Sequence, residues 1–384
     1  MRFAFYNHSK TPNLKHKDFK CYCYFNKAHY TRKESFEEPD FVQGKSALFP
    51  WVSTTTEIQI HGNCLKNDNF IVVFYKVLVL IEYWKVNGFE IKFLHPVNAD
   101  KEVWRQMIQR LNDSTSWFKV YMHTYQSTSH QLVFGPKFAH ITYEPHYNAD
   151  SGNPPCWPFW FSKKGLTFSN LTSVTIGGSS SFDAEIDLHS VPFFFQLSGV
   201  ELKKLAFVYL NLVVNSLTSE WRMVRIKELH FIGCTVTPKA NLLLMCNPCF
   251  VSEKLVINGQ GLNILKVFDF PCLKYLEISN QKLARNPFPT DFSLPNLQQL
   301  YCPIDPADGT PFLESLLKFR KLEVLVLYFC RASEKSTQRL RGEVISNTPT
   351  LKSLTLIGDN AAKTYINPSW QEEHDPIDSL LATS

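Results

Sequence analysis

The sequence predicts an α/β repeat protein, a solenoid whose short parallel strands form one curved sheet with helices and loops on its convex side. Three observations predict this fold. An apolar pattern recurs with a period of about 26 residues, each copy alternates like a strand, and helix-like or Pro-rich segments separate the copies. The chain has 384 residues, of which 44% are apolar and 20% charged. This composition is typical of a folded chain that can bury a sizeable core.

The pattern has Leu-type residues at the first, fourth and sixth positions and an Asn/Cys position at the ninth, and the individual copies depart from it to different degrees. In the segment CLKYLEISNQKL these positions hold Leu273, Leu276, Ile278 and Gln281. The alternation buries one face of a short strand, and stacking of neighbouring units makes the core continuous, because one unit cannot cover its own apolar face. The first positions of the eight copies are Leu171, Leu202, Ile226, Ser252, Leu273, Leu297, Leu322 and Leu351.

Two of the segments between copies have a helical apolar stripe. These are Pro311 to Phe319 and Ser336 to Ile345, and Ser336 is a candidate N-cap. Asn286 to Asn296 is rich in Pro, so we expect loops or short helical turns there. Cys234 and Cys330 occupy the Asn/Cys position, which predicts buried side chains that turn the chain at the end of a strand.

Residues 51–147 alternate between strand and helix signals and are interpreted as diverged α/β repeats or as a separate small α/β cap. Residues 100–111 predict an amphipathic helix with Asp100 as its N-cap. Strands are expected over 56–64, 89–94, 118–122 and 139–143. Residues 70–84 form the most apolar segment, but at about 15 residues with two charges it is too short to span a membrane, so we expect a buried helix or helix–strand pair.

The remaining segments differ in composition. Residues 1–50 predict a basic, irregular arm, and residues 148–165 predict a Pro- and aromatic-rich insertion whose rings pack on the core or anchor a partner. The repeat array itself is expected over 166–366, and residues 367–384 predict an acidic tail.

No pattern in the sequence predicts catalysis or a cofactor. Cys246 and Cys249 form a C-x-x-C, but no second pair follows at a spacing that zinc requires. We therefore expect no enzyme activity, no cofactor and no metal site. No secretory leader is visible in the first residues, so the expected compartment is the cytoplasm, or alternatively the nucleus, with free cysteines.

The repeats resemble the leucine-rich repeat family in its irregular, ribonuclease-inhibitor-like form. The degenerate units are similar to those of F-box/leucine-rich-repeat proteins. That resemblance implies that the array is the substrate-recognition part of a ubiquitin ligase and that an F-box docks a Skp-type adaptor. Residues 1–50 do not contain the L-P-x-E stretch and the short apolar helices of an F-box, so an adaptor role has no motif behind it in this chain.

In such an array the outward side chains of the strands form the concave binding face. This face mixes aromatic, charged and apolar groups, so we expect a protein or peptide partner and neither nucleic acid nor membrane. The alternatives are a structural or regulatory scaffold and, less favoured, an enzyme with its site in residues 51–150. The candidate partner-binding residues are His230, Tyr275, Glu277, Tyr301, Val326 and Tyr328.

Overall fold

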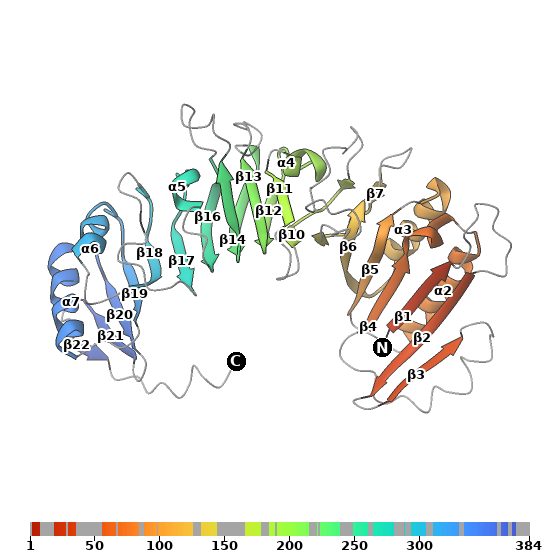
Figure 1. Cartoon of the computed structure of the whole chain (residues 1–384), viewed down its shortest axis with the longest axis horizontal. Helices are drawn as coiled ribbons and strands as arrows, with labels where there is room; N and C mark the ends of the chain where they lie inside the picture. The colour runs from red at the N-terminus through yellow and green to blue at the C-terminus, as the bar shows by residue number, and fades with distance from the viewer. Residues whose placement is uncertain are drawn as a thin grey trace. The chain divides into compact units, whose positions relative to one another are not determined.

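The chain is an α/β protein built on mostly parallel strands with few helices, as the sequence predicts (Figure 1). It divides into two compact units, Met1–Ala184 with Ser190–Leu197, and Glu185–His189 with Ser198–Ser384. The computed structural model describes residues 2–7, 19–27, 30–35, 56–66, 68–83, 88–97, 99–125, 132–143, 166–177, 184–188, 190–214, 221, 223–238, 249–259, 264–279, 288, 293–304, 310–329, 334–358, 362–367 and 371–373. The expected insertion at 148–165 lies outside these residues.

The first unit is built on a sheet with the order β3-β2-β1-β4-β5-β6-β8-β10. The pairs among β1, β2 and β3 are antiparallel and the other pairs are parallel, while β7 and β9 pair separately. The bounds are β1 (Arg2–Asn7), β2 (Phe19–Lys27), β3 (Tyr30–Ser35), β4 (Thr56–His61), η3 (Gly62–Lys66), α2 (Asp68–Tyr83), β5 (Gly88–Val97), α3 (Lys101–Asp113), β6 (Trp117–Tyr125), β7 (Leu132–Phe134), β8 (His140–Tyr143), β9 (Leu166–Phe168), β10 (Ser173–Gly177) and α4 (Ser190–Phe194).

Three strands, β1 to β3, stand where an irregular basic arm was expected over residues 1–50. The expectation was drawn from the charge of this segment. Its period-two alternation, as in FKCYCYF, is the signal that the charge count obscured. β2 pairs antiparallel with both β1 and β3, so its backbone groups are paired on both sides.

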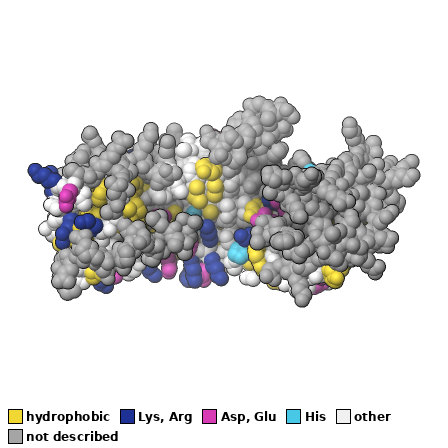
Figure 2. Space-filling view, turned by 90° about the horizontal axis from the view of Figure 1, so that it is seen from below, with side chains coloured by type: hydrophobic (Ala, Val, Ile, Leu, Met, Phe, Trp, Pro, Cys, Tyr) yellow, Lys and Arg dark blue, Asp and Glu magenta, His cyan; other side chains and the backbone are white. Residues whose placement is uncertain are grey.

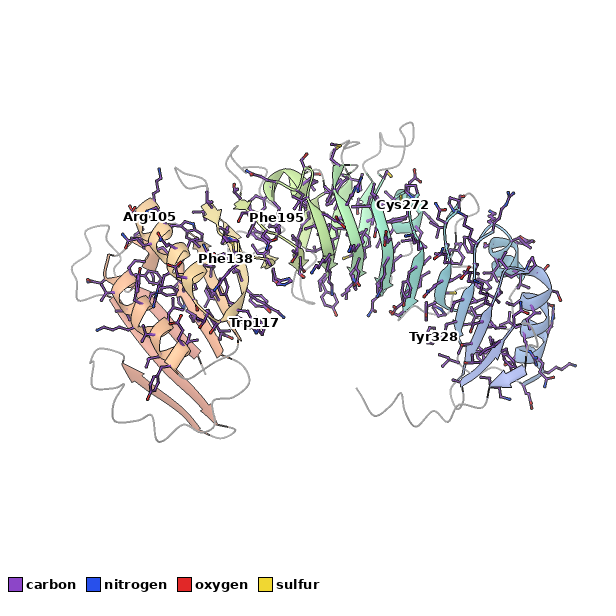
Figure 3. All side chains as sticks on the ribbon, turned by 180° about the vertical axis from the view of Figure 1, so that it is seen from behind. Arg105, Trp117, Phe138, Phe195, Cys272 and Tyr328 are labelled. Atoms are coloured by element: carbon purple, nitrogen blue, oxygen red, sulfur yellow. The ribbon has the colours of Figure 1, made fainter. Side chains whose placement is uncertain are left out.

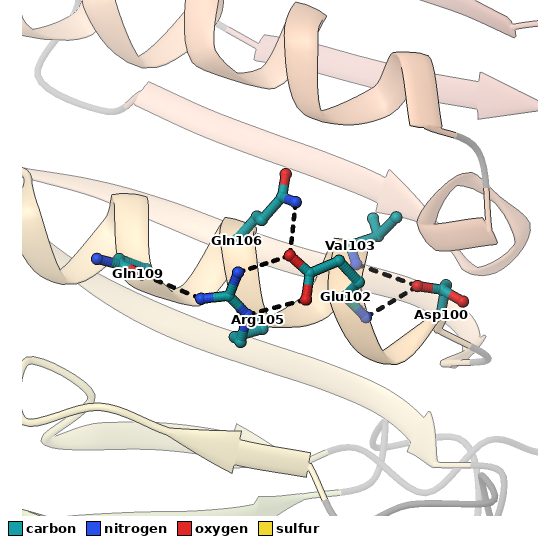
Figure 4. Close-up of polar contacts among 6 residues, drawn as sticks. All are labelled: Asp100, Glu102, Val103, Arg105, Gln106 and Gln109. Atoms are coloured by element: carbon teal, nitrogen blue, oxygen red, sulfur yellow. Dashed lines mark hydrogen bonds and ion pairs between the residues drawn. The ribbon is translucent and has the colours of Figure 1, made fainter.

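The expected helices of this unit are confirmed. The apolar segment from residue 70 lies in α2, which buries one face and exposes Val72 and Val79 on the other. Helix α3 begins after Asp100, whose Oδ1 accepts hydrogen bonds from the backbone N–H groups of Glu102 at 2.8 Å and Val103 at 3.2 Å (Figure 4). This is the predicted N-cap, and it satisfies two donors that the first helical turn leaves unpaired.

Aromatic rings fill much of the space between the sheet and α3. Trp104 lies against Phe93 and Phe134, with centroid distances of 5.6 and 5.2 Å, and Phe138 contacts both Phe134 and Phe118. The Trp104 indole N–H donates to the carbonyl of Val133 at 3.2 Å. The chain contains 31 Phe residues, and the four named here take core positions between the sheet and α3.

The second unit is built on parallel strands in the order β12-β14-β16-β17-β18-β19-β20, extended by antiparallel β21 and β22. The bounds are β11 (Ala184–Asp187), β12 (Glu201–Val208), β13 (Leu210–Val214), β14 (Arg225–Ile232), β15 (Thr235–Pro238), β16 (Val251–Asn258), α5 (Ile264–Val267), β17 (Tyr275–Ser279), β18 (Gln299–Pro303), α6 (Thr310–Leu316), β19 (Val324–Tyr328), α7 (Glu334–Asn347), β20 (Ser353–Ile357), β21 (Ala362–Ile366) and β22 (Gln371–Glu373).

One local geometry recurs in successive copies of the sequence pattern. In the last four copies the backbone N–H of the first-position Leu donates to the carbonyl three residues earlier, at 3.1 to 3.3 Å, and each of these Leu side chains is fully buried. A turn with positive φ also follows β12, β14 and β16, at Tyr209, Gly233 and Gly259. At Gly259 an added Cβ would lie 3.1 Å from the Cα of Gly233, so stacking of the units as well as φ favours glycine there. The Leu residues are Leu273, Leu297, Leu322 and Leu351.

Two details of the crossovers differ from expectation. β11, β13 and β15 form a second, small sheet where helices or loops were expected after the first copies, because LNLVV and TVTP are themselves alternating. Ser336 lies inside α7, which begins at Glu334, so the predicted N-cap is wrong. Cys234 is buried as expected, with its Sγ donating to the carbonyl of Ile232 at 3.5 Å, and Cys330 lies outside the described residues.

Among the residues that the structure describes, none of the helices is long and apolar enough to cross a membrane.

Candidate partner-binding face

The strands of the second unit present their side chains in straight columns, and the inner columns form the core. Leu205, Leu229, Leu255, Leu276, Leu300, Leu325 and Leu354 are paired in register along seven strands, and all are fully buried. On the same inner side, the rings of Phe207 and Phe231 stack at 5.4 Å. The fold of this unit is therefore held by one side of its sheet.

The outward side chains of β12 to β20 form a surface that we call the open face. Its two outer columns are in register as the sequence predicts, and five of the six candidate residues lie in them. The sixth, Tyr328, lies at the carboxyl end of β19, and Figure 3 shows it and Cys272 at opposite edges of the strands. The columns contain Lys204, Glu228, Lys254, Tyr275, Gln299, Val324 and Ser353, and Ala206, His230, Val256, Glu277, Tyr301, Val326 and Thr355.

The open face has a charged part over β12, β14 and β16. His230 Nε2 lies 3.2 Å from Glu228 Oε2, and the His230 side chain is 14% exposed. Burial lowers the pKa of His230, which the carboxylate of Glu228 opposes and the charges of Lys204 and Lys254 reinforce. Basic and acidic groups alternate across these strands, and the described side chains visible in Figure 2 likewise mix both signs.

The other part of the open face, over β17 to β19, is aromatic. The rings of Tyr275 and Tyr301 lie 4.9 Å apart at 31°, and the ammonium group of Lys254 lies 4.8 Å from the centroid of the Tyr275 ring. The Tyr275 hydroxyl donates to Glu277 Oε2 at 2.9 Å. Tyr328 is 37% exposed, whereas Val326 is 7% exposed and offers a partner little surface.

Burial and a neighbouring carboxylate disfavour ionisation of two of these tyrosines, Tyr275 and Tyr328. Burial raises the pKa of Tyr275, and its hydrogen bond to Glu277 raises that pKa further. Burial also raises the pKa of Tyr328, with the charge of Glu277 as the second cause. Tyr275 and Tyr328 therefore keep their hydroxyl protons and can act as hydrogen-bond donors throughout the physiological pH range.

The outward side of β4 to β6 in the first unit also holds a polar cluster, which sequence reasoning did not identify. Lys92 Nζ lies 2.8 Å from Glu57 Oε2 and 3.6 Å from Glu90 Oε2, and the Tyr121 hydroxyl donates to Glu90 Oε1 at 3.1 Å. Gln59 donates to Glu57 as well. The alternation of β4 and β5 already places these residues outward, so their pattern could have revealed the cluster.

The structure describes one of the two cysteines of the C-x-x-C segment and some of the other possible metal ligands. Cys249 forms no disulfide with another described cysteine, and Cys246 lies outside the described residues. Burial raises the pKa of Cys64 to about 12 and that of Cys234 to about 11. Within the described residues there is no group of three His, Cys, Asp or Glu side chains that could hold a metal ion.

Comparison with protein-family models, with curated proteins and with solved structures finds no match. What can be said of function therefore rests on the geometry of the open face.

Proposed function

We propose that this chain is a leucine-rich-repeat protein that binds a protein or peptide partner on the open face of its second unit. The observation behind this proposal is the difference in residue type between the two sides of the sheet. The inner columns bury the apolar residues, whereas most positions of the outer columns carry aromatic, charged or polar side chains, with Ala206, Val256, Val324 and Val326 as the apolar exceptions. Aromatic residues with a few charged groups are typical of the centre of protein interfaces.

The composition of the face favours a protein over other partners. A nucleic-acid site needs basic groups in excess to neutralise phosphates, and in the outer columns the two lysines, Lys204 and Lys254, are equalled in number by two acidic residues, Glu228 and Glu277. We propose the cytoplasm or nucleus as the compartment, as the sequence predicts. We propose no cofactor and no catalytic step for this face.

The test is affinity capture of the tagged full chain with quantitative mass spectrometry. The face variant combines Tyr301→Ala, Tyr328→Ala and Glu277→Lys, and the control is Tyr83→Ala at an exposed position of α2 (63% exposed). We expect partners that the parent and the control retain and the face variant loses by tenfold or more. Equal retention by all three proteins, with folding verified by circular dichroism, contradicts the proposal.

The same capture separates a ligase subunit from a scaffold. A Skp-type adaptor and a cullin among the retained proteins would support a role as substrate receptor of a ubiquitin ligase. Face-dependent partners without either component would support a scaffold or regulatory module.

A further inference from the structure

The aromatic part of the open face surrounds one carboxylate. Glu277 lies directly opposite Tyr301 in the register of β17 and β18. Tyr275 precedes it by two positions on the same outward side, and Tyr328 lies at the end of the next strand, opposite Pro303. We call Tyr275, Glu277, Tyr301 and Tyr328 the tyrosine–carboxylate cluster.

The distances within the cluster bring these groups together, since the Tyr275 and Tyr301 rings lie 4.9 Å apart and the Tyr275 hydroxyl lies 2.9 Å from Glu277 Oε2. The charge of Glu277 contributes to the raised pKa of both Tyr275 and Tyr328, and the Tyr301 phenol contributes to both as well. The cluster therefore combines three phenols and one carboxylate within electrostatic range of one another on a partly buried surface.

The carboxylate has no cation of its own among the described residues. On the outward side of β17 to β20, Glu277 is the only charged side chain that the structure describes. The basic residue on the adjacent strand, Lys254, lies opposite Tyr275 and packs on its ring, and it forms no ion pair with Glu277. Only one described hydrogen bond reaches this carboxylate, from Tyr275 to Oε2, so Oε1 is left to accept another.

A half-buried carboxylate flanked by aromatic rings attracts a cation, because the negative ring faces and the carboxylate act in the same direction in a partly desolvated site. The free acceptor Oε1 favours a cation that carries N–H groups, a primary ammonium or a guanidinium. An anionic group would be repelled by the carboxylate of Glu277, and the ammonium group of Lys254 already lies on the Tyr275 ring.

We infer that the tyrosine–carboxylate cluster recognises a lysine or arginine side chain of the partner, which pairs with Glu277 and lies against Tyr301 and Tyr328. This inference rests on the proposed function, since it names the partner group that the same face selects. It makes Glu277 the residue that sets specificity and the tyrosines the residues that supply contact area.

The experiment is a selection of random 12-residue peptides displayed on phage against the immobilised full chain. The test variant is Glu277→Gln, which keeps an acceptor for the Tyr275 hydroxyl and so preserves the local hydrogen bond. The matched control is Glu343→Gln on α7, where the carboxylate pairs with Arg339 at 2.7 Å. Selected peptides are then synthesised with lysine or its uncharged isostere norleucine at each enriched basic position.

We expect enrichment of lysine or arginine at one position with the parent chain and with Glu343→Gln. Replacing lysine by norleucine should raise the dissociation constant for the parent about tenfold, in line with the loss of a cation–π contact and a charge-assisted hydrogen bond. For Glu277→Gln the dissociation constant of the norleucine peptide divided by that of the lysine peptide should fall to roughly two or less. Glu277→Lys should instead select acidic peptides.

Two further outcomes separate the inference from the proposed function. In the first, the selected peptides lose binding to the double variant Tyr301→Ala, Tyr328→Ala but carry no enriched basic residue, or Glu277→Gln leaves the ratio of their norleucine and lysine dissociation constants unchanged. Either result would overturn the inference and leave the face as a binding site. Peptides that bind equally to the face variants, or a selection that yields none, would overturn both.

Discussion

Phe250 is the side chain whose loss should most affect the second unit alone. It precedes β16, is fully buried, and contacts the rings of Trp221 at 4.9 Å, Phe268 at 5.1 Å, Phe270 at 6.1 Å and Phe231 at 6.2 Å. Phe→Ala substitutions in protein cores cost about 3–5 kcal/mol. Four ring partners and complete burial place Phe250→Ala in the upper part of this range, at about 4–5 kcal/mol, because each aromatic pair adds to the area term.

The assay is hydrogen exchange followed by mass spectrometry, which reports opening free energies segment by segment. We expect the amides of β14 and β16 to lose protection in Phe250→Ala, and those of β4 and β5 in the first unit to keep it. The control Phe250→Leu retains most of the volume and should cost about 1–2 kcal/mol. A loss below about 1 kcal/mol for Phe250→Ala, or an equal loss in both units, would refute the reasoning.

Three further predictions use the same chain. Burial lowers the pKa of His230, so the unfolded chain takes up this proton more readily. As pH falls below the ordinary histidine value of about 6.5, the second unit should lose stability in urea titrations, and His230→Gln should weaken that dependence. Asp100→Ala removes the N-cap of α3 and should destabilise the first unit by about 1 kcal/mol in the same titrations, whereas a cost near zero would show that the cap is dispensable. Exposed Cys272 should react with iodoacetamide long before Cys302, whose pKa is raised by complete burial, and equal rates by peptide mapping would contradict the burial pattern.

The strands of the array were predictable because their periodicity is local. A buried residue at every second position specifies which side chains face inward, so the outward columns could be read from the sequence residue by residue. Helix α3 was predictable for the same reason, since its N-cap and apolar stripe lie within thirteen residues. Cys234 could be assigned a buried role from its position in the repeat alone.

The parts that escaped prediction depend on contacts between distant segments. β1, β2 and β3 are stabilised by pairing with one another, and the basic residues around them obscured their alternation. The boundary between the units near residues 184–198 is invisible in the sequence, because the apolar pattern continues from Leu171 to Leu202 across it. Periodicity places a residue on a face but does not fix its rotamer, so the convergence of Tyr275 on Glu277 had to come from the structure.

The two parts of the open face differ in how their charges are balanced, and Lys254 marks the border. Towards β12, Glu228 lies beside His230 and opposite Lys204 and Lys254 on the neighbouring strands, so this carboxylate has basic groups on both sides. Towards β20, Lys254 lies on the Tyr275 ring and Glu277 keeps an uncompensated charge. Desolvating a carboxylate without a counter-ion costs free energy that a cation in the partner offsets. A partner without a basic group at this position would therefore bind more weakly than one with it, even where the apolar contacts are the same, and discrimination of this kind is how an interface becomes specific.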